Sequence, residues 1–165
     1  MSCWNKLHEW HRAGVWDCVL EVLLARLHKA DKIDWRRAVL DSSSVGAVHG
    51  GEETGPSPVD RAKSGSEHHV LTDARGISLV ARVIRVNRND VTQAKRLIEA
   101  TPPVRGKRGR SRRRPRALHA GRGYDSDEVR RWLIARGIRP VIARRNTARG
   151  SGLGRYRWVV ERTHA

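Results

Sequence analysis

The sequence predicts an α/β fold in which a mixed sheet is flanked by helices and preceded by a short helical segment. Apolar residues recur at helical spacing from Trp4 to Leu27, and Gly14 marks a break between two helices. The rest of the chain begins with a hairpin pattern and then alternates between strand-like and helical runs, which is typical of a sheet with helices on its faces. We therefore expect a helical N-terminal segment over residues 1–34 and an α/β domain over residues 35–165.

The elements of the α/β domain can be placed from apolar runs and turn residues. Ala38–Leu40 is a short apolar run, which predicts a buried strand that delivers Asp41 at its end. Residues 50–66 are rich in Gly, Pro and Ser and predict a loop. The other expected elements are a hairpin (69–72 and 77–86, turn 73–76), a helix from Asn89 or Asp90 to about residue 100, a strand (116–120), a helix (126–136), a strand (140–143) and a helix that opens at residue 156.

The tryptophans indicate which residues form the core of the helical segment, and the cysteines indicate the cellular compartment. Trp4, Trp10 and Trp16 are expected to pack as core side chains of the helical segment. Cys3 and Cys18 have no nearby CxxC partner, so neither a disulfide framework nor a zinc knuckle is expected. The sequence has no apolar run of membrane-spanning length and no signal-peptide pattern. We expect a cytoplasmic protein associated with the nucleoid.

The charge balance predicts a polyanionic partner. Lys and Arg number 34 against 17 Asp and Glu, for a formal net charge of +17. Basic side chains that neutralise phosphates release condensed counterions, so DNA is the expected partner. A ribosomal-type protein, a basic tail on an unrelated fold, or Arg codons favoured by a GC-rich genome would give a similar composition.

Two basic segments are expected to be solvated loops that contact DNA. Residues 105–116 carry eight Arg or Lys in twelve positions, which predicts a mobile loop, and residues 144–154 form a second basic stretch with glycines. The candidate phosphate-binding side chains are Arg112, Arg113, Arg114, Arg144, Arg145 and Arg157.

Two acidic residues are candidates for phosphoryl-transfer chemistry. Cleavage of DNA by two metal ions needs several carboxylates that converge on one place. Asp41 follows an apolar strand, and Glu161 is a lone acid among the apolar and basic residues of 158–162. Judged from the residues alone, an acid at a strand end is often a turn residue, and an acid beside Arg162 is often only an ion pair.

Seven ordered motifs resemble one protein family. They are Val39-Leu40-Asp41-Ser42-Ser43, Gly55-Pro56-Ser57-Pro58-Val59-Asp60-Arg61, Gly65-Ser66-Glu67-His68-His69-Val70, Asp73-Ala74-Arg75-Gly76, Asn87-Arg88-Asn89-Asp90, Gly123-Tyr124-Asp125-Ser126 and Arg157-Trp158-Val159-Val160-Glu161-Arg162-Thr163. In this order they are similar to bacterial insertion-sequence transposases with an Asp-Asp-Glu (DDE) catalytic domain. The resemblance implies an RNase H-like fold, Mg²⁺ or Mn²⁺, nicking of DNA by water, and attack of a 3′-hydroxyl on target DNA.

The resemblance also assigns roles to individual residues. Asp41 would coordinate both ions, Glu161 would help to hold one, and Arg157 matches the Arg of the family's Tyr-Arg-Glu-Lys signature. Gly154 stands where that signature has Tyr, and Glu67 stands where family members usually carry Lys, while the signature's Lys would lie beyond residue 165. The chain is therefore expected to be a truncated family member.

The second acid of the triad is the most consequential departure. The family pattern Ala-Asp-Arg-Gly-Tyr-Asp is here Ala120-Gly121-Arg122-Gly123-Tyr124-Asp125, so Gly121 occupies the second triad position. Asp125, four residues later, is the tentative replacement ligand, and metal binding is expected to be impaired. Histidines 68, 69 and 119 flank strands and are expected to be surface or core residues sooner than ligands.

Three functions remain open at this point. The first is a transposase domain or remnant that binds transposon ends and target DNA, alone, as a homodimer or with an intact transposase. The second is a catalytically inactive DNA-binding regulator of transposition. The third is a nuclease with rearranged acids, which would need Asp125 or Asp73 as a substitute ligand.

Overall fold

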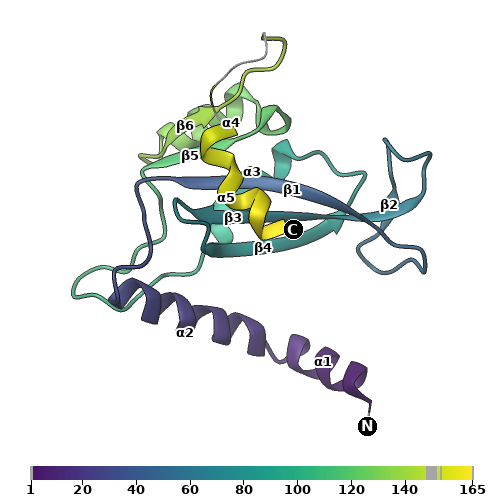
Figure 1. Ribbon diagram of the computed structural model, residues 1–165, viewed down its shortest axis with the longest axis horizontal. Coiled ribbons are helices and arrows are strands. Elements are labelled where there is room, and N and C mark those ends of the chain that lie inside the picture. Colours follow the sequence, from purple (N-terminus) through teal and green to yellow (C-terminus); the bar gives the residue numbers. More distant parts are fainter. Residues whose placement is uncertain (1, 148–151, 153, 165) are drawn as a thin grey trace. The chain divides into compact units, whose positions relative to one another are not determined.

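The computed structural model describes residues 2–147, 152 and 154–164 (Figure 1). The elements in chain order are α1 (Cys3–Arg12), α2 (Val15–Lys29), β1 (Ala38–Gly46), β2 (Gly55–Pro56), β3 (Ser64–Asp73), β4 (Ser78–Arg85), α3 (Val91–Ala100), β5 (Ala117–Ala120), the 3₁₀-helix η1 (Arg122–Tyr124), α4 (Asp127–Ile134), β6 (Arg139–Ile142) and α5 (Gly154–His164). The chain divides into two compact units: residues 1–33 with 102–113, and residues 34–101 with 114–165. No helix among the described residues is both long enough and apolar enough to cross a membrane.

The first unit contains the two expected N-terminal helices. Gly14 separates α1 from α2 in the left-handed conformation, with φ +69°, which a glycine adopts without steric cost. The prediction that the tryptophans form a core is wrong, because Trp4, Trp10 and Trp16 are 67%, 40% and 45% exposed. Trp10 and Trp16 contact each other edge to face across the helix break, at 5.7 Å between ring centroids. A unit of two helices and one short segment offers too little surface to bury large rings.

The basic segment Pro102–Arg113 belongs to this first unit and is anchored, contrary to the expectation of a mobile loop. Val104 and Arg112 close it through two backbone hydrogen bonds. Gly106, with φ +109°, lies so close to α2 that a Cβ there would be 2.2 Å from the Ala25 carbonyl oxygen. Lys107 pairs with Asp31 at 2.6 Å. Gly106 therefore permits close packing against α2.

The second unit is built on a sheet that is mixed, as the sequence predicts, and that has six strands instead of the expected five. β1 pairs antiparallel with β3 and parallel with β5, β4 pairs antiparallel with β3, and β6 extends the sheet parallel to β5. The expected loop over 50–66 is interrupted, because β2 forms a short antiparallel pair with the start of β3. β1 also runs five residues beyond Asp41, since its serines continue the ladder with β3.

The turn between β3 and β4 is held by the buried carboxylate of Asp73. It accepts hydrogen bonds from the backbone N–H groups of Asp34 (2.7 Å), Arg75 (2.9 Å) and Ile77 (2.8 Å). These bonds occupy both carboxylate oxygens. Asp73 therefore has a structural role, which argues against its use as a substitute metal ligand.

Helices cover the two faces of the sheet. α5, yellow in Figure 1, crosses one face over β1 and β5. Its apolar residues Val159 and Val160 pack against Val39 of β1 and Val70 of β3. α3 packs against β3, β4 and α4. Because successive side chains of a strand point to opposite faces, residues 39, 41, 68 and 70 share the face beneath α5, and residues 42, 67 and 69 point to the other.

Candidate active site

Strand alternation places two of the predicted triad positions on the face covered by α5. Asp41 lies two residues after Val39 on β1, and Gly121 lies two residues after His119, which pairs with Val39 across β1 and β5. His119 contacts Tyr156 of α5 edge to face, with 5.2 Å between ring centroids, which confirms the face that it occupies. Positions 41 and 121 therefore point to the same helix.

Arg157 of α5 meets Asp41 directly. Its Nη2 atom donates to both carboxylate oxygens of Asp41, at 2.7 and 2.8 Å. The Asp41 side chain is 14% exposed and that of Arg157 is 29% exposed, so the pair is only partly solvated. Charge-assisted contacts of this length are stronger than neutral hydrogen bonds.

The same guanidinium lies against the other two triad positions. A Cβ built on Gly121 would be 3.3 Å from Arg157 Nη1. Glu161, one turn further along α5, is 4.0 Å from Arg157 Nη2 and 57% exposed. The structure thus brings together Asp41, Gly121 and Glu161 as the sequence places them, and Arg157 stands at their centre.

The donor set does not fit a two-metal site. Gly121 supplies no side-chain oxygen, and its backbone (φ −71°, ψ 176°) is extended, so nothing in its conformation requires glycine. Both Asp41 oxygens accept from Arg157, and Glu161 is the remaining carboxylate of the three positions. A divalent ion at Asp41 would have to displace a guanidinium and would gain too few oxygen ligands in return.

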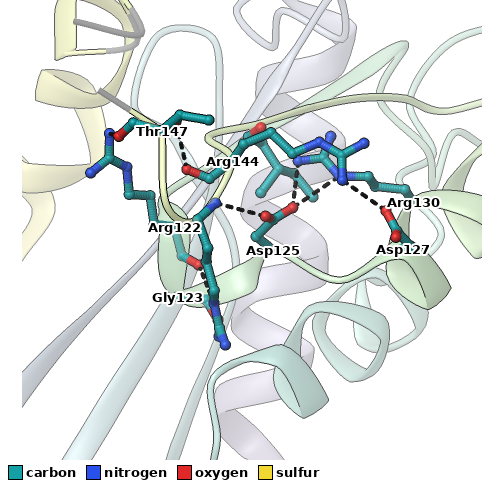
Figure 2. A network of polar contacts seen from close by, with 9 residues as sticks. Arg122, Gly123, Asp125, Asp127, Arg130, Arg144 and Thr147 are labelled. Atoms are coloured by element: carbon teal, nitrogen blue, oxygen red, sulfur yellow. Dashed lines mark hydrogen bonds and ion pairs between the residues drawn. The ribbon is translucent and has the colours of Figure 1, made fainter. Parts of the chain in front are cut away.

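Asp125 serves a different part of the unit. Its Oδ1 accepts from Arg130 Nε at 3.0 Å and Nη2 at 2.6 Å, and its Oδ2 accepts from the Arg145 backbone N–H at 2.8 Å (Figure 2). Burial opposes ionisation of this carboxyl, but the hydrogen bonds from Arg145 and Arg130 outweigh it and lower its pKa. Asp125 therefore ties α4 to the loop after β6, and these bonds leave it poorly suited to hold an ion.

The arginines predicted to contact DNA lie in different settings. Arg112, Arg113 and Arg114 are exposed. Arg144 is exposed but pairs with Asp127 at 2.8 Å, and the Arg145 side chain donates to the carbonyl oxygens of Arg122 and Gly123. Arg122 in turn donates to the Thr147 carbonyl (Figure 2). Residues 148–151 and 153 of the second basic segment lie outside the described residues.

A basic cavity next to α5 was missed from the sequence. It has a volume of about 490 Å³ and is lined by Arg36, Arg37, Ala117, His119, Arg139, Val141 and Tyr156. Burial lowers the pKa of His119, and Arg37 and Arg139 lower it further. The sequence did contain a signal for this cavity. Residues 37, 117 and 139 stand at the beginnings of three parallel strands, and the beginnings of parallel strands lie at the same end of a sheet.

Comparisons with known proteins identify the family of this chain. Residues 36–165 match the family described as the transposase DDE domain, and the chain belongs to that family. It is 56% identical over 130 residues to the putative transposase for insertion sequence element IS402 of Burkholderia cepacia, a match that covers 79% of this chain and 60% of that protein. The chain thus spans about three fifths of the length of this relative. The expected family and the RNase H-like fold class are confirmed.

Solved structures show more distant likeness. A simian T-cell lymphotropic virus intasome in complex with the PP2A regulatory subunit B56 gamma has a TM-score of 0.49 and 16% identity, over 80% of this chain and 38% of the other. The catalytic domain of the Mos1 mariner transposase has a TM-score of 0.40 and 13% identity, over 78% of this chain and 58% of the other.

Proposed function

We propose that this chain acts in insertion-sequence transposition by binding transposon-end DNA, and that it does not cut DNA through the divalent-metal centre that its family implies. The contact between Arg157 and Asp41, beside a glycine at position 121, is the observation that carries the second half of this proposal. The net charge of +17 carries the first half.

Asp41 already has a cation, which is the guanidinium of Arg157. In a two-metal centre the aspartate bridges ions that are also held by other carboxylates. Here the guanidinium supplies a fixed positive charge at Asp41 without any ion, and Gly121 supplies no second carboxylate to compete for it. Mg²⁺ sheds its water reluctantly and gains little at a single carboxylate that is already paired. Arg157 therefore neutralises the charge of Asp41, as a metal ion would, but it cannot activate water.

The proposal that the chain binds DNA rests on basic side chains that phosphate groups can reach. Arg112–Arg114 are solvent-exposed and supply charge without the need to break a buried contact. In the second unit, Arg36, Arg37 and Arg139 surround a cavity that is wide enough for a phosphate group. Phosphate contacts of this kind position a protein on DNA without reading its sequence.

A nicking assay with matched aspartate variants tests the catalytic half. Supercoiled plasmid and a transposon-end duplex are incubated with the chain and Mg²⁺ or Mn²⁺, and metal binding is followed by calorimetry. Gly121→Asp places a carboxylate against Arg157, whereas Gly46→Asp adds the same group at a position where nothing lies within 4 Å of the new Cβ. We expect no nicking by the unmodified chain, and tighter Mg²⁺ binding by Gly121→Asp than by Gly46→Asp or the parent.

One result would contradict the proposal that the chain does not cut DNA. Metal-dependent nicking by the unmodified chain that Asp41→Ala abolishes would show that the centre works without a carboxylate at position 121. Adding the chain to an intact transposase of the family with its own transposon ends separates two modes of action: reduced cleavage identifies a regulator, and unchanged cleavage leaves DNA binding without inhibition.

A further inference from the structure

Three potential metal ligands meet on the face of the sheet opposite Asp41. Glu67 and His69 are two residues apart on β3 and therefore point the same way, and Asp90 stands immediately before α3, which packs on β3. One ligand atom from each lies within 4.8 Å of the others. None of these three residues belongs to the group formed by Arg157, Asp41, Gly121 and Glu161.

His69 presents a buried nitrogen to this group. The side chain is fully buried, and its Nδ1 lies 2.8 Å from the hydroxyl oxygen of Tyr124. Its Nε2 is buried, has no hydrogen-bond partner among the described residues, and lies 3.7 Å from Glu67 Oε2. With the proton on Nδ1, the imidazole directs the Nε2 lone pair toward Glu67, and Tyr124 fixes the ring, as outer-shell partners do for metal-binding histidines.

Among the residues that the structure describes, neither carboxylate forms an ion pair with a Lys or Arg side chain. Glu67 is 9% exposed, and burial raises its pKa, as does the neighbouring charge of Asp90, although a hydrogen bond with Ser42 opposes this. A bound divalent ion would neutralise both carboxylates. Burial of unpaired like charges is otherwise costly.

The group opens to a cavity that would admit an ion and water. This cavity, of about 260 Å³, is lined in part by Glu67, Asp90 and Gly123. A Cβ at position 123 would be 2.5 Å from Asp90 Oδ2, so a side chain there would make the Asp90 carboxylate move. Arg88 and Arg145 also line the cavity; Arg88 is exposed, and the guanidinium of Arg145 is held by two backbone carbonyls.

We propose that Glu67, His69 and Asp90 bind a divalent first-row transition metal ion such as zinc. One imidazole nitrogen and two carboxylate oxygens form a donor set that suits Zn²⁺, with bonds of about 2.0–2.2 Å, and disfavours Mg²⁺, which prefers oxygen alone. Ligand atoms of a tetrahedral zinc site lie about 3.4 Å apart, so the three side chains must close by roughly an ångström. Water from the cavity supplies the fourth ligand. This site is independent of the proposed function.

Calorimetric titration of the full chain with Zn²⁺, and with Co²⁺ whose visible absorption reports its ligands, tests the site. We expect one ion per chain, no comparable binding of Mg²⁺, and a rise in the unfolding temperature with Zn²⁺. Glu67→Gln and Asp90→Asn should each weaken Zn²⁺ binding at least tenfold. The matched controls Asp60→Asn and His49→Gln change an exposed acid and an exposed histidine and should bind as the parent does.

Two results would overturn the site. One is zinc affinity in Glu67→Gln and Asp90→Asn equal to that of the parent, which would assign the binding to other histidines. The other is the absence of stoichiometric binding by the parent chain. Circular dichroism of each variant establishes that it is folded, and the conservative Asp90→Asn, at a half-buried position, keeps the test open if Glu67→Gln does not fold. Neither result depends on DNA nicking.

Discussion

The pair between Arg157 and Asp41 should be a measurable part of the stability of the second unit. We expect Asp41→Asn and Arg157→Gln each to lower the free energy of unfolding by about 2 kcal/mol, because each leaves a partly buried charge unpaired. For a chain of 165 residues this corresponds to a fall in unfolding temperature of about 4–8 °C. In the double variant neither charge remains, so its loss should be smaller than the sum of the two.

A double-mutant cycle isolates the contact energy. Hydrogen bonds to charged groups contribute roughly 1.5–3 kcal/mol, and the 29% exposure of Arg157 reduces this by solvent screening to about 1–2 kcal/mol of coupling. The cycle between Arg157 and Glu161, which are 4.0 Å apart with the acid 57% exposed, is the internal control and should give no more than about 0.5 kcal/mol. Urea denaturation of the six proteins provides the data. Additivity within about 0.3 kcal/mol for Arg157 and Asp41 would refute the contact.

Three further outcomes are expected. Replacing Arg112, Arg113 and Arg114 by Ala should weaken DNA binding and flatten the slope of log K against log salt by up to about 2.7, measured by fluorescence anisotropy; an unchanged slope would exclude these side chains from the contact surface. Burial lowers the pKa of His69, so the folded state keeps it neutral and stability falls as pH drops below its usual value of 6.5, although Asp90 and Asp41 favour the proton. In His69→Gln this loss of stability, measured as the difference between urea melts at pH 7.5 and pH 5, should be smaller than in the parent. An equal loss in the two proteins would contradict the attribution of the pH dependence to His69. Gly109→Ala, with φ +102° and no atom within 4 Å of its Cβ, should cost only the backbone strain of about 1–3 kcal/mol, whereas Gly106→Ala should destabilise the first unit by more than this because its Cβ meets Ala25; equal effects would disprove the close packing against α2.

Much of the second unit could be predicted because its signals are local. The apolar run before Asp41, the turn at Asp73 and the alternation of strands and helices each depend on a few neighbouring residues. Alternation within strands also places positions 41 and 121 on one face once the pairing of β1 with β5 is known.

The contacts that decide the site are not local. Arg157 and Asp41 are 116 positions apart, and the sequence indicated Arg157 as a phosphate contact and as the signature arginine, but not as the partner of Asp41. The pairing of Asp125 with Arg130 depends on where the loop after β6 returns. The anchoring of Pro102–Arg113 depends on Gly106 meeting α2, which no feature of a basic, glycine-rich run reveals.

The two faces of the sheet differ in which cation their charges favour. By resemblance to the family, position 121 would carry Asp and position 67 would carry Lys. Glycine at 121 removes a negative charge beside Asp41, and Arg157 then suffices to neutralise that carboxylate. Glutamate at 67 replaces a positive charge beside Asp90 and His69 with a negative one, and no basic side chain pairs with it among the described hydrogen bonds and ion pairs except His69. Glycine at 121 therefore weakens a divalent-ion site on one face, and glutamate at 67 favours one on the other, so Gly121→Asp with Glu67→Lys in a single chain should reverse that preference.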